Sequence, residues 1–291
     1  MLTANSQAVI TCHVGSPQKG TIPEIVQSVH LLVRPLLLVL LCAACPAPGL
    51  AQVSDPHEAQ PERPSVATHA GTVAPGWVEI EAGAEIDRYA DRSQGGSIPM
   101  VFKLGLAPRL QLTVQTPTVR PPHQTTTGFG DVSARVKWRL VDGAPVVGDF
   151  ALLPSIKFPS GSANSGTGTG TTDFGVVFIS SHAFGSVAMD LNVGYGRRSG
   201  DGTNASRNFT VWAVAFGGPA HKSFGWSAEL FSYPGTSGPR GTRRTVALLA
   251  GPTWQVRKWL VLDAGFIAPI AGPQFRAIYV GATYNVGKLG N

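Results

Sequence analysis

The chain has 291 residues and a formal net charge of +6, and only 14% of its residues are charged, against about 25% in typical soluble domains. The basic residues stand singly or in isolated pairs, which excludes the clustered patch of a nucleic-acid-binding protein, so no nucleic-acid partner is expected. All three cysteines, Cys12, Cys42 and Cys45, precede residue 51. A cysteine metal cluster, a disulfide framework and a cysteine nucleophile are therefore excluded from the rest of the chain.

Residues 36–45 form a short apolar run that follows Arg34 and leads into small residues and prolines. This pattern predicts a signal peptide cleaved near Ala51, and the run is too short for a membrane-spanning helix. A lipoprotein signal at Cys45 is the alternative, but the position three residues earlier, where that motif expects an aliphatic side chain, holds another cysteine. We therefore assign residues 1–51 to a signal peptide with a long N-terminal extension.

The remainder divides into a lead-in, a patterned body and a tail. Residues 52–76 are rich in proline, alanine, glutamine and charge without periodicity, which predicts a flexible lead-in. Its two histidines, His57 and His69, are expected to be solvated, and no metal-binding spacing or cofactor motif is present in the chain. Residues 77–286 alternate between polar and apolar with a period of two, and residues 287–291 are a short tail.

The alternation is clearest between residues 131 and 140, where Val, Ala, Val, Trp and Leu alternate with charged or hydroxyl side chains. Successive side chains of a strand point to opposite faces, so this ribbon is apolar on one face and charged on the other. A helix would scatter the same residues around its circumference. The pattern predicts twelve strands, each close to the ~9 to 11 residues that a tilted strand needs to cross a bilayer: 77–89, 98–106, 110–116, 128–140, 149–158, 172–180, 186–195, 208–216, 224–233, 245–256, 259–268 and 274–286.

The connections between these strands sort by length. Short turns follow the second, sixth, eighth and tenth strands, and a moderate connection, 141–148, follows the fourth. The intervening loops 90–97, 117–127, 159–171, 196–207 and 234–244 are longer, and the last connection, 269–273, is the exception. Outer-membrane barrels pair short periplasmic turns with long outer loops and an even strand count. The sequence thus predicts an all-β fold, a transmembrane antiparallel up-and-down β-barrel. Aromatic residues near the strand ends are expected to form interfacial girdles: Trp77, Tyr89, Phe158, Tyr195, Tyr233 and Trp259.

Charged residues on the polar rows are the candidates for the lining of a lumen. A charge facing lipid near the midplane costs up to about 2 to 4 kcal/mol, so several in one row would exceed the ~5 to 15 kcal/mol stability of a typical fold. They are therefore expected to point inward: Glu79, Glu81, Glu85, Asp87, Lys103, Asp131, Arg135, Lys137, Arg139, Lys157, Asp173, Asp190 and Glu229. Two interpretations remain open, a lumen filled by ion pairs or a charged water path that orients polar or anionic solutes.

Catalytic chemistry finds little support in the sequence. A serine–histidine pair needs a third group to orient it, but His123 is expected in an outer loop, and His182 and His221 in short turns without such partners. The glycine-rich run Gly166–Thr172 lacks the lysine of a phosphate loop and enters a strand, so it is expected to be a mobile outer loop. We expect no enzymatic activity.

Three sequence blocks resemble a known family. They are Gly128-Phe129-Gly130-Asp131 leading to Lys137-Trp138-Arg139-Leu140, then Lys157-Phe158-Pro159-Ser160-Gly161, then Gly170-Thr171-Thr172-Asp173-Phe174-Gly175. Together they resemble the outer-membrane barrels described as "putative MetA-pathway of phenol degradation". The resemblance implies a Gram-negative outer-membrane transporter whose partners are outer-membrane lipids, the barrel-insertion machinery and a small-molecule solute. One departure is the C-terminus, because such barrels commonly finish on an aromatic residue and this chain continues past Tyr284 to Asn291.

The function expected from the sequence is passive uptake of small solutes, aromatic or otherwise hydrophobic, through an outer-membrane pore. The first alternative is a structural or adhesion barrel with a plugged lumen. The second is a soluble secreted β-sandwich, because alternation by itself does not distinguish a barrel that is polar inside from a fold that is polar outside.

Overall fold

The computed structural model describes residues 55–63, 65–200, 202, 205–239, 241–272 and 275–290. The predicted signal peptide and its alternative, the lipoprotein signal, lie outside these residues. The described residues contain thirteen β-strands, and none of their segments is a helix long and apolar enough to cross a membrane.

The strands follow one another in chain order with short connections. They are β1 (Trp77–Tyr89), β2 (Gln94–Ala107), β3 (Leu110–Arg120), β4 (Gly128–Phe129), β5 (Val132–Ala144), β6 (Gly148–Phe158), β7 (Asp173–Phe184), β8 (Val187–Arg198), β9 (Asn208–His221), β10 (Phe224–Tyr233), β11 (Thr245–Arg257), β12 (Leu260–Ala271) and β13 (Phe275–Lys288). Because β4 has only two residues and pairs only with β3, the wall of the fold consists of the other twelve strands.

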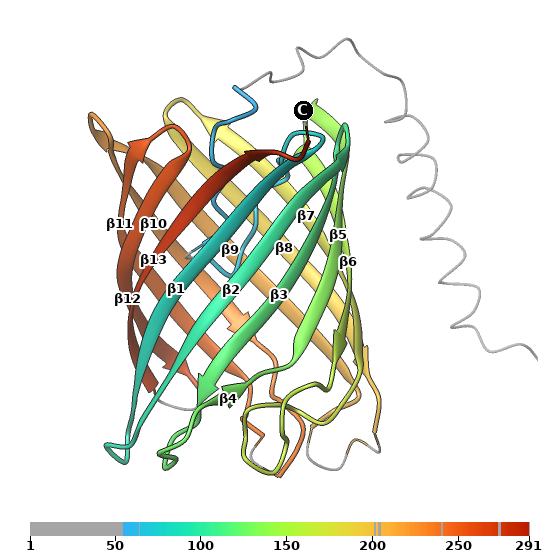
Figure 1. The fold of residues 1–291 in the computed structure, drawn as a ribbon, viewed down its shortest axis with the longest axis vertical. Helices are drawn as coiled ribbons and strands as arrows, with labels where there is room; N and C mark the ends of the chain where they lie inside the picture. Colours follow the sequence, from blue (N-terminus) through green and yellow to red (C-terminus); the bar gives the residue numbers. More distant parts are fainter. Residues whose placement is uncertain are drawn as a thin grey trace, which may run out of the picture. The chain divides into compact units, whose positions relative to one another are not determined.

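The sheet closes on itself. Each of the twelve strands pairs antiparallel with its neighbours, and β1 pairs with both β2 and the last strand, β13. Figure 1 shows the strands tilted around one cylinder. The predicted twelve-stranded up-and-down β-barrel is confirmed, and the β-sandwich is excluded because a closed cylinder has no second sheet and no free edge.

The two faces of the wall differ as the alternation predicts. In β2, Phe102 and Leu106 are 39% and 48% exposed on the outer face, whereas Lys103 is 1% exposed on the inner face. The same contrast separates Ile278, 63% exposed, from its neighbour Ala277, 3% exposed, in β13. The outer surface is therefore apolar and the inner surface holds the ionic groups, which is the arrangement a bilayer requires.

Connections of two kinds meet at opposite ends of the barrel. The turns 108–109, 145–147, 185–186, 222–223 and 258–259 lie at one end, here called the turn end, together with the start of β1 and the end of β13. The segments 121–131, 159–172, 199–207 and 234–244 lie at the other, the loop end. The predicted sorting of connections by length is confirmed for these loops.

Several predicted strand boundaries are wrong, most clearly those of β2 and β3. The β1–β2 connection is a tight hairpin, because Gln94 to Ser97 pair with β1 instead of forming a loop. Strand β3 continues through Pro117 to Arg120, where it pairs with β2. Both extensions arise because a partner strand stabilises residues whose own propensity disfavours strands.

The predicted strand 128–140 is interrupted at Gly130 and Asp131. Gly130 packs so closely on β3 that a Cβ there would lie 2.6 Å from the Pro117 side chain. Its N–H donates to the Pro117 carbonyl (2.8 Å). The break frees Asp131 from the sheet and turns it toward the outer loops.

Candidate functional site in the barrel lumen

Residues 55–63 and 65–75, here called the inner segment, lie inside the barrel. Figure 1 shows this blue segment entering from the turn end and running back to the start of β1. Near its beginning the Ala59 N–H donates to the Lys258 carbonyl (2.8 Å), and near its end Pro75 bridges to Gly105. Since both contacts are at the turn end, the segment forms a loop that occupies this half of the lumen.

The inner segment has no regular secondary structure, and the wall supplies hydrogen-bond acceptors for its backbone. The acceptors are side chains that point inward from five strands, β1, β3, β7, β8 and β10. Gln60 N–H donates to Glu79 (2.7 Å), Glu62 to Glu81 (2.7 Å), Val66 and Ala67 to Glu229 (2.9 and 2.7 Å), Thr68 to Asn192 (2.9 Å), Ala70 to Ser181 (2.8 Å) and Val73 to Gln111 (2.9 Å). Buried amides need such partners, so the polar rows of the wall are complementary to this segment.

Lys137 binds the inner segment most extensively. Its Nζ donates to the Glu62 carboxylate (2.6 Å), the Thr68 hydroxyl (2.8 Å) and the His69 carbonyl (2.8 Å). The side chain of Lys137 is fully buried and that of Glu62 is 13% exposed. A buried ion pair of this kind leaves a costly uncompensated charge when one partner is removed.

A second lysine, Lys103, holds the acidic row of β1. It forms ion pairs with Glu79 and with Glu81, the latter at 2.5 Å, and all three side chains are fully buried. It also donates to the carbonyl of Gln60 in the inner segment. Both β1 carboxylates that accept from the segment's amides thus share one wall cation.

The lead-in was expected to be flexible, and the structure differs. Ala67 and Ala70 pack in apolar clusters with wall residues, beside Phe231 and beside Leu153 respectively. His57 contacts the wall: its ring lies 5.1 Å from that of Trp77 and its Nε2 is 3.2 Å from the Asn285 carbonyl. Composition could not reveal this, because the wall supplies the partners that a polar segment lacks in isolation.

At the loop end, Asp131 organises a second cluster. Its carboxylate accepts hydrogen bonds from the Thr169 hydroxyl (2.6 Å) and N–H (2.9 Å) and from the Gly161 N–H (3.1 Å), and it pairs with Lys157 (3.1 Å). Lys157 also pairs with Asp173 (3.3 Å). Burial raises the pKa of Asp131, but the bonds from Thr169, Lys157 and Gly161 outweigh it and hold that pKa below its usual range.

The three sequence blocks that carried the resemblance therefore meet in one place. Asp131 belongs to the first, Lys157 and Gly161 to the second and Asp173 to the third. The glycine-rich run was expected to be mobile, but Thr169 and Thr171 within it bind Asp131 and Asp173. The Thr169 N–H donates to the Asp131 carboxylate rather than being free for a phosphate. The loop is therefore held at the mouth of the barrel.

The remaining predicted lining residues have different surroundings. Glu85 and Asp87 hydrogen-bond to each other, and Asp190 accepts from the Ser181 hydroxyl (2.5 Å). Arg135 has no ion pair within the described part of the chain. Arg139 lies at the turn-end rim, where it pairs with Asp142 (2.5 Å) and Asp149 (2.8 Å). The thirteen predicted residues thus divide between the inner segment, the mouth, the rim and the wall between them.

Sequence reasoning missed several partners of the inner segment. Glu62 was overlooked because it lies in the unpatterned lead-in, and Gln111, Ser181 and Asn192 because only charged residues were considered. The polar rows contained a signal for these neutral residues, since each shares a face with a predicted charge.

The histidines and aromatic residues depart in part from expectation. His182 and His221 lie at the ends of β7 and β9 rather than in turns. His182 contacts the Ser180 hydroxyl (2.9 Å), a pair that the sequence analysis did not foresee, but Ser180 donates to the Val147 carbonyl (2.8 Å). No group of three or more His, Cys, Asp or Glu side chains among the described residues is arranged to hold a metal ion.

The predicted aromatic girdles are only partly correct. Phe158 and Tyr195 are exposed, 45% and 51%, on the outer face. Trp77 instead contacts His57 of the inner segment, and Tyr233 packs edge-on against the buried ring of Phe231, so it shares the inner face. The prediction considered position along a strand and ignored which face the residue occupies.

An apolar exterior, a charged interior and a closed antiparallel wall define a transmembrane β-barrel whose lumen is partly filled by its own N-terminal segment. The family model described as "Putative MetA-pathway of phenol degradation" matches residues 62–281. The chain therefore belongs to this family, as the three sequence blocks indicated.

Solved structures are similar to this chain at low sequence identity. The COG4313 outer membrane channel from Pseudomonas putida F1 has a TM-score of 0.52 at 14% identity, with 74% of this chain and 97% of that chain covered. The KdgM porin in complex with oligogalacturonate has a TM-score of 0.46 at 12% identity, covering 71% and 98%. The translocator domain of the autotransporter NalP from Neisseria meningitidis has a TM-score of 0.44 at 12% identity, covering 74% and 89%. No curated protein sequence is significantly similar to this chain.

Proposed function

We propose that the protein is an outer-membrane channel for passive uptake of small solutes, and that the inner segment is its gate. The observation that carries this proposal is the polarity of the wall: its ionic groups face inward on a closed cylinder whose outside is apolar. A lumen lined by charge favours water over hydrocarbon. The Pseudomonas putida protein of similar structure is described as an outer membrane channel, which supports the same function.

Gating is supported by how the inner segment is held. It contributes no strand to the wall, and seven of its backbone amides donate hydrogen bonds to wall side chains. Water can replace such bonds at modest net cost, so the segment could leave the lumen without breaking the barrel. Small aromatic solutes are supported by the description of the family, which names phenol degradation.

The second candidate is a structural barrel that the inner segment closes permanently. The buried ion pair between Lys137 and Glu62 favours it, because separating the pair exposes two charges to a poorly solvated lumen. The two candidates differ in one property, which is whether the full-length protein conducts ions.

A reversible tether tests the gate. The Ala70 N–H donates a 2.8 Å hydrogen bond to the Ser181 hydroxyl, and the chain has no cysteine after Cys45. In the protein without residues 1–51, the double substitution A70C/S181C therefore introduces a single pair of cysteines that oxidation can join. In planar bilayers we expect the oxidised variant to show few openings and the reduced variant to conduct like the wild-type protein. The single substitution A70C, oxidised and reduced, is the control. If neither the wild-type protein nor the reduced variant conducts, the result supports the permanently closed barrel instead.

A further inference from the structure

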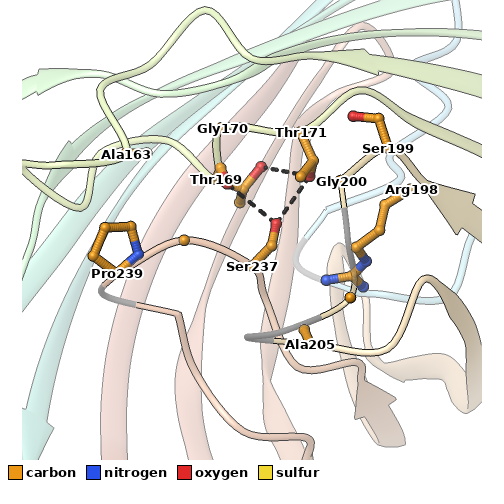
Figure 2. A pocket seen from close by; sticks show the side chains of 12 residues that line it. Ala163, Thr169, Gly170, Thr171, Arg198, Ser199, Gly200, Ala205, Ser237 and Pro239 are labelled. Carbon is orange, nitrogen blue, oxygen red and sulfur yellow. Dashed lines mark hydrogen bonds between the residues drawn. The ribbon is translucent and has the colours of Figure 1, made fainter.

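Two neighbouring cavities lie at the loop end, and the Arg198 side chain lines both. The first, of about 240 Å³, has a hydroxyl-rich wall in which the Thr171 hydroxyl is 2.9 Å from that of Ser237 (Figure 2). The second, of about 420 Å³, is lined by Arg243 and Arg244 as well. Among the described residues, neither lining includes an aspartate or glutamate.

Arg198 is buried but incompletely satisfied. It is 4% exposed, its Nη1 donates to the Gly235 carbonyl (2.8 Å) and its guanidinium lies 4.5 Å above the Phe209 ring. Its Nε has no hydrogen-bond partner in the part of the chain that the structure describes. A buried donor left unpaired is destabilising, and a guanidinium without a carboxylate partner retains its full charge for a ligand.

Arg244 provides a second guanidinium with a neutral partner. Its Nε donates to the Ser232 hydroxyl (2.9 Å), and it forms no ion pair with any described residue. The wall lysines Lys103, Lys137 and Lys157 are paired with carboxylates, unlike these two arginines. The loop end thus concentrates uncompensated positive charge around cavities of the size that holds a small molecule.

We propose that these cavities bind a small organic carboxylate entering from the loop end, with Arg198 and Arg244 as its anchors. Guanidinium groups bind carboxylates through paired, charge-assisted hydrogen bonds, and the Phe209 ring beneath Arg198 adds apolar surface for the rest of the ligand. This inference rests on the proposed function, because it names the chemical class of the solute. It predicts preference for an aromatic acid over the neutral phenol.

Titration calorimetry of the full-length protein in detergent, with benzoate as the probe, tests the site without a membrane. We expect R198Q and R244Q each to weaken benzoate binding by about tenfold, the loss of a hydrogen bond to a charged group. R197Q is the matched control, because Arg197 is the exposed neighbour on the opposite face of β8. Heat-modifiable gel mobility verifies that each variant is folded. If R198Q does not fold, the benzoate affinity of R244Q alone tests the site.

The outcomes divide clearly. Weaker binding in R198Q and R244Q, with R197Q unchanged and phenol unable to displace benzoate, supports the carboxylate site. Equal benzoate affinity in all four proteins, displacement by phenol, or tighter binding of inorganic phosphate than of benzoate would overturn it. Binding is measured here without conduction, so a protein that binds benzoate but never conducts would refute the channel and leave this site standing.

Discussion

Arg135 differs from the other basic residues of strand β5. Lys137 is paired with Glu62 of the inner segment and Arg139 with Asp142 and Asp149 at the rim. Arg135 faces the lumen without an ion pair in the described part of the chain. The sequence predicted that all three residues point inward, whereas the structure distinguishes them by their ion-pair partners.

The expected consequence is a difference in ion selectivity. R135Q should raise the cation-to-anion permeability ratio by up to about thirtyfold, because a unit charge ~4 Å from a passing ion in water-like surroundings contributes about 1 kcal/mol, unfavourable for a cation and favourable for an anion. The double variant R139Q/D149N should leave the ratio nearly unchanged, since it removes one charge of each sign from a pair at the rim. Reversal potentials in asymmetric salt measure both variants. Equal shifts in the two would show that the unpaired charge of Arg135 does not govern selectivity.

Individual residues show how far alternation predicts a site. Glu79, Glu81 and Lys103 are on the inner face, where they form cross-strand ion pairs. Asp131 is not on a strand at all, because Gly130 breaks the sheet just before it. Its hydrogen bonds to Gly161 and Thr169 span 30 and 38 residues, a distance that no local pattern encodes.

At the scale of elements, the inner segment depends on one buried lysine. K137M removes the partner of Glu62 and leaves that carboxylate without its cation in the lumen. Loss of one member of a buried pair costs about 3 to 5 kcal/mol. We therefore expect the amides of Ala67 and Ala70 to exchange hydrogen at least about 100-fold faster in K137M.

K258M is the matched control for this variant. Lys258 pairs with Asp55 at 3.6 Å, but its side chain is 71% exposed, and exposed pairs contribute at most about 1 kcal/mol. Hydrogen exchange of the inner segment should change little. Comparable exchange rates in K137M and K258M would show that the buried pair does not retain the segment.

At the scale of the whole molecule, the orientation of the wall is the central feature. Ile278 is 63% exposed on β13 and its neighbour Ala277 is 3% exposed. A maleimide dissolved in the lipid phase should therefore label I278C in proteoliposomes and spare A277C, because adjacent residues of a strand face opposite sides. Comparison with a water-soluble maleimide controls for thiol reactivity. Labelling of A277C in preference to I278C would mean that the wall is inside out.

The sequence by itself determined the wall of this protein. The two-residue period, the sorted loops and the cost of charge in lipid sufficed to predict a closed barrel with twelve strands, and the three sequence blocks indicated its family. These features are local, because each strand carries its own apolar and polar faces, and the bilayer acts on every strand in the same way.

Only the tertiary structure decided what fills the lumen inside this wall. The inner segment has no period, and its position follows from acceptors on strands distant in sequence, such as Glu229, 163 residues from Val66. The cluster at Asp131 and the cavities at Arg198 likewise combine loops that are distant in sequence. Each depends on the closed cylinder, because only the closed cylinder brings these side chains, distant in sequence, close together.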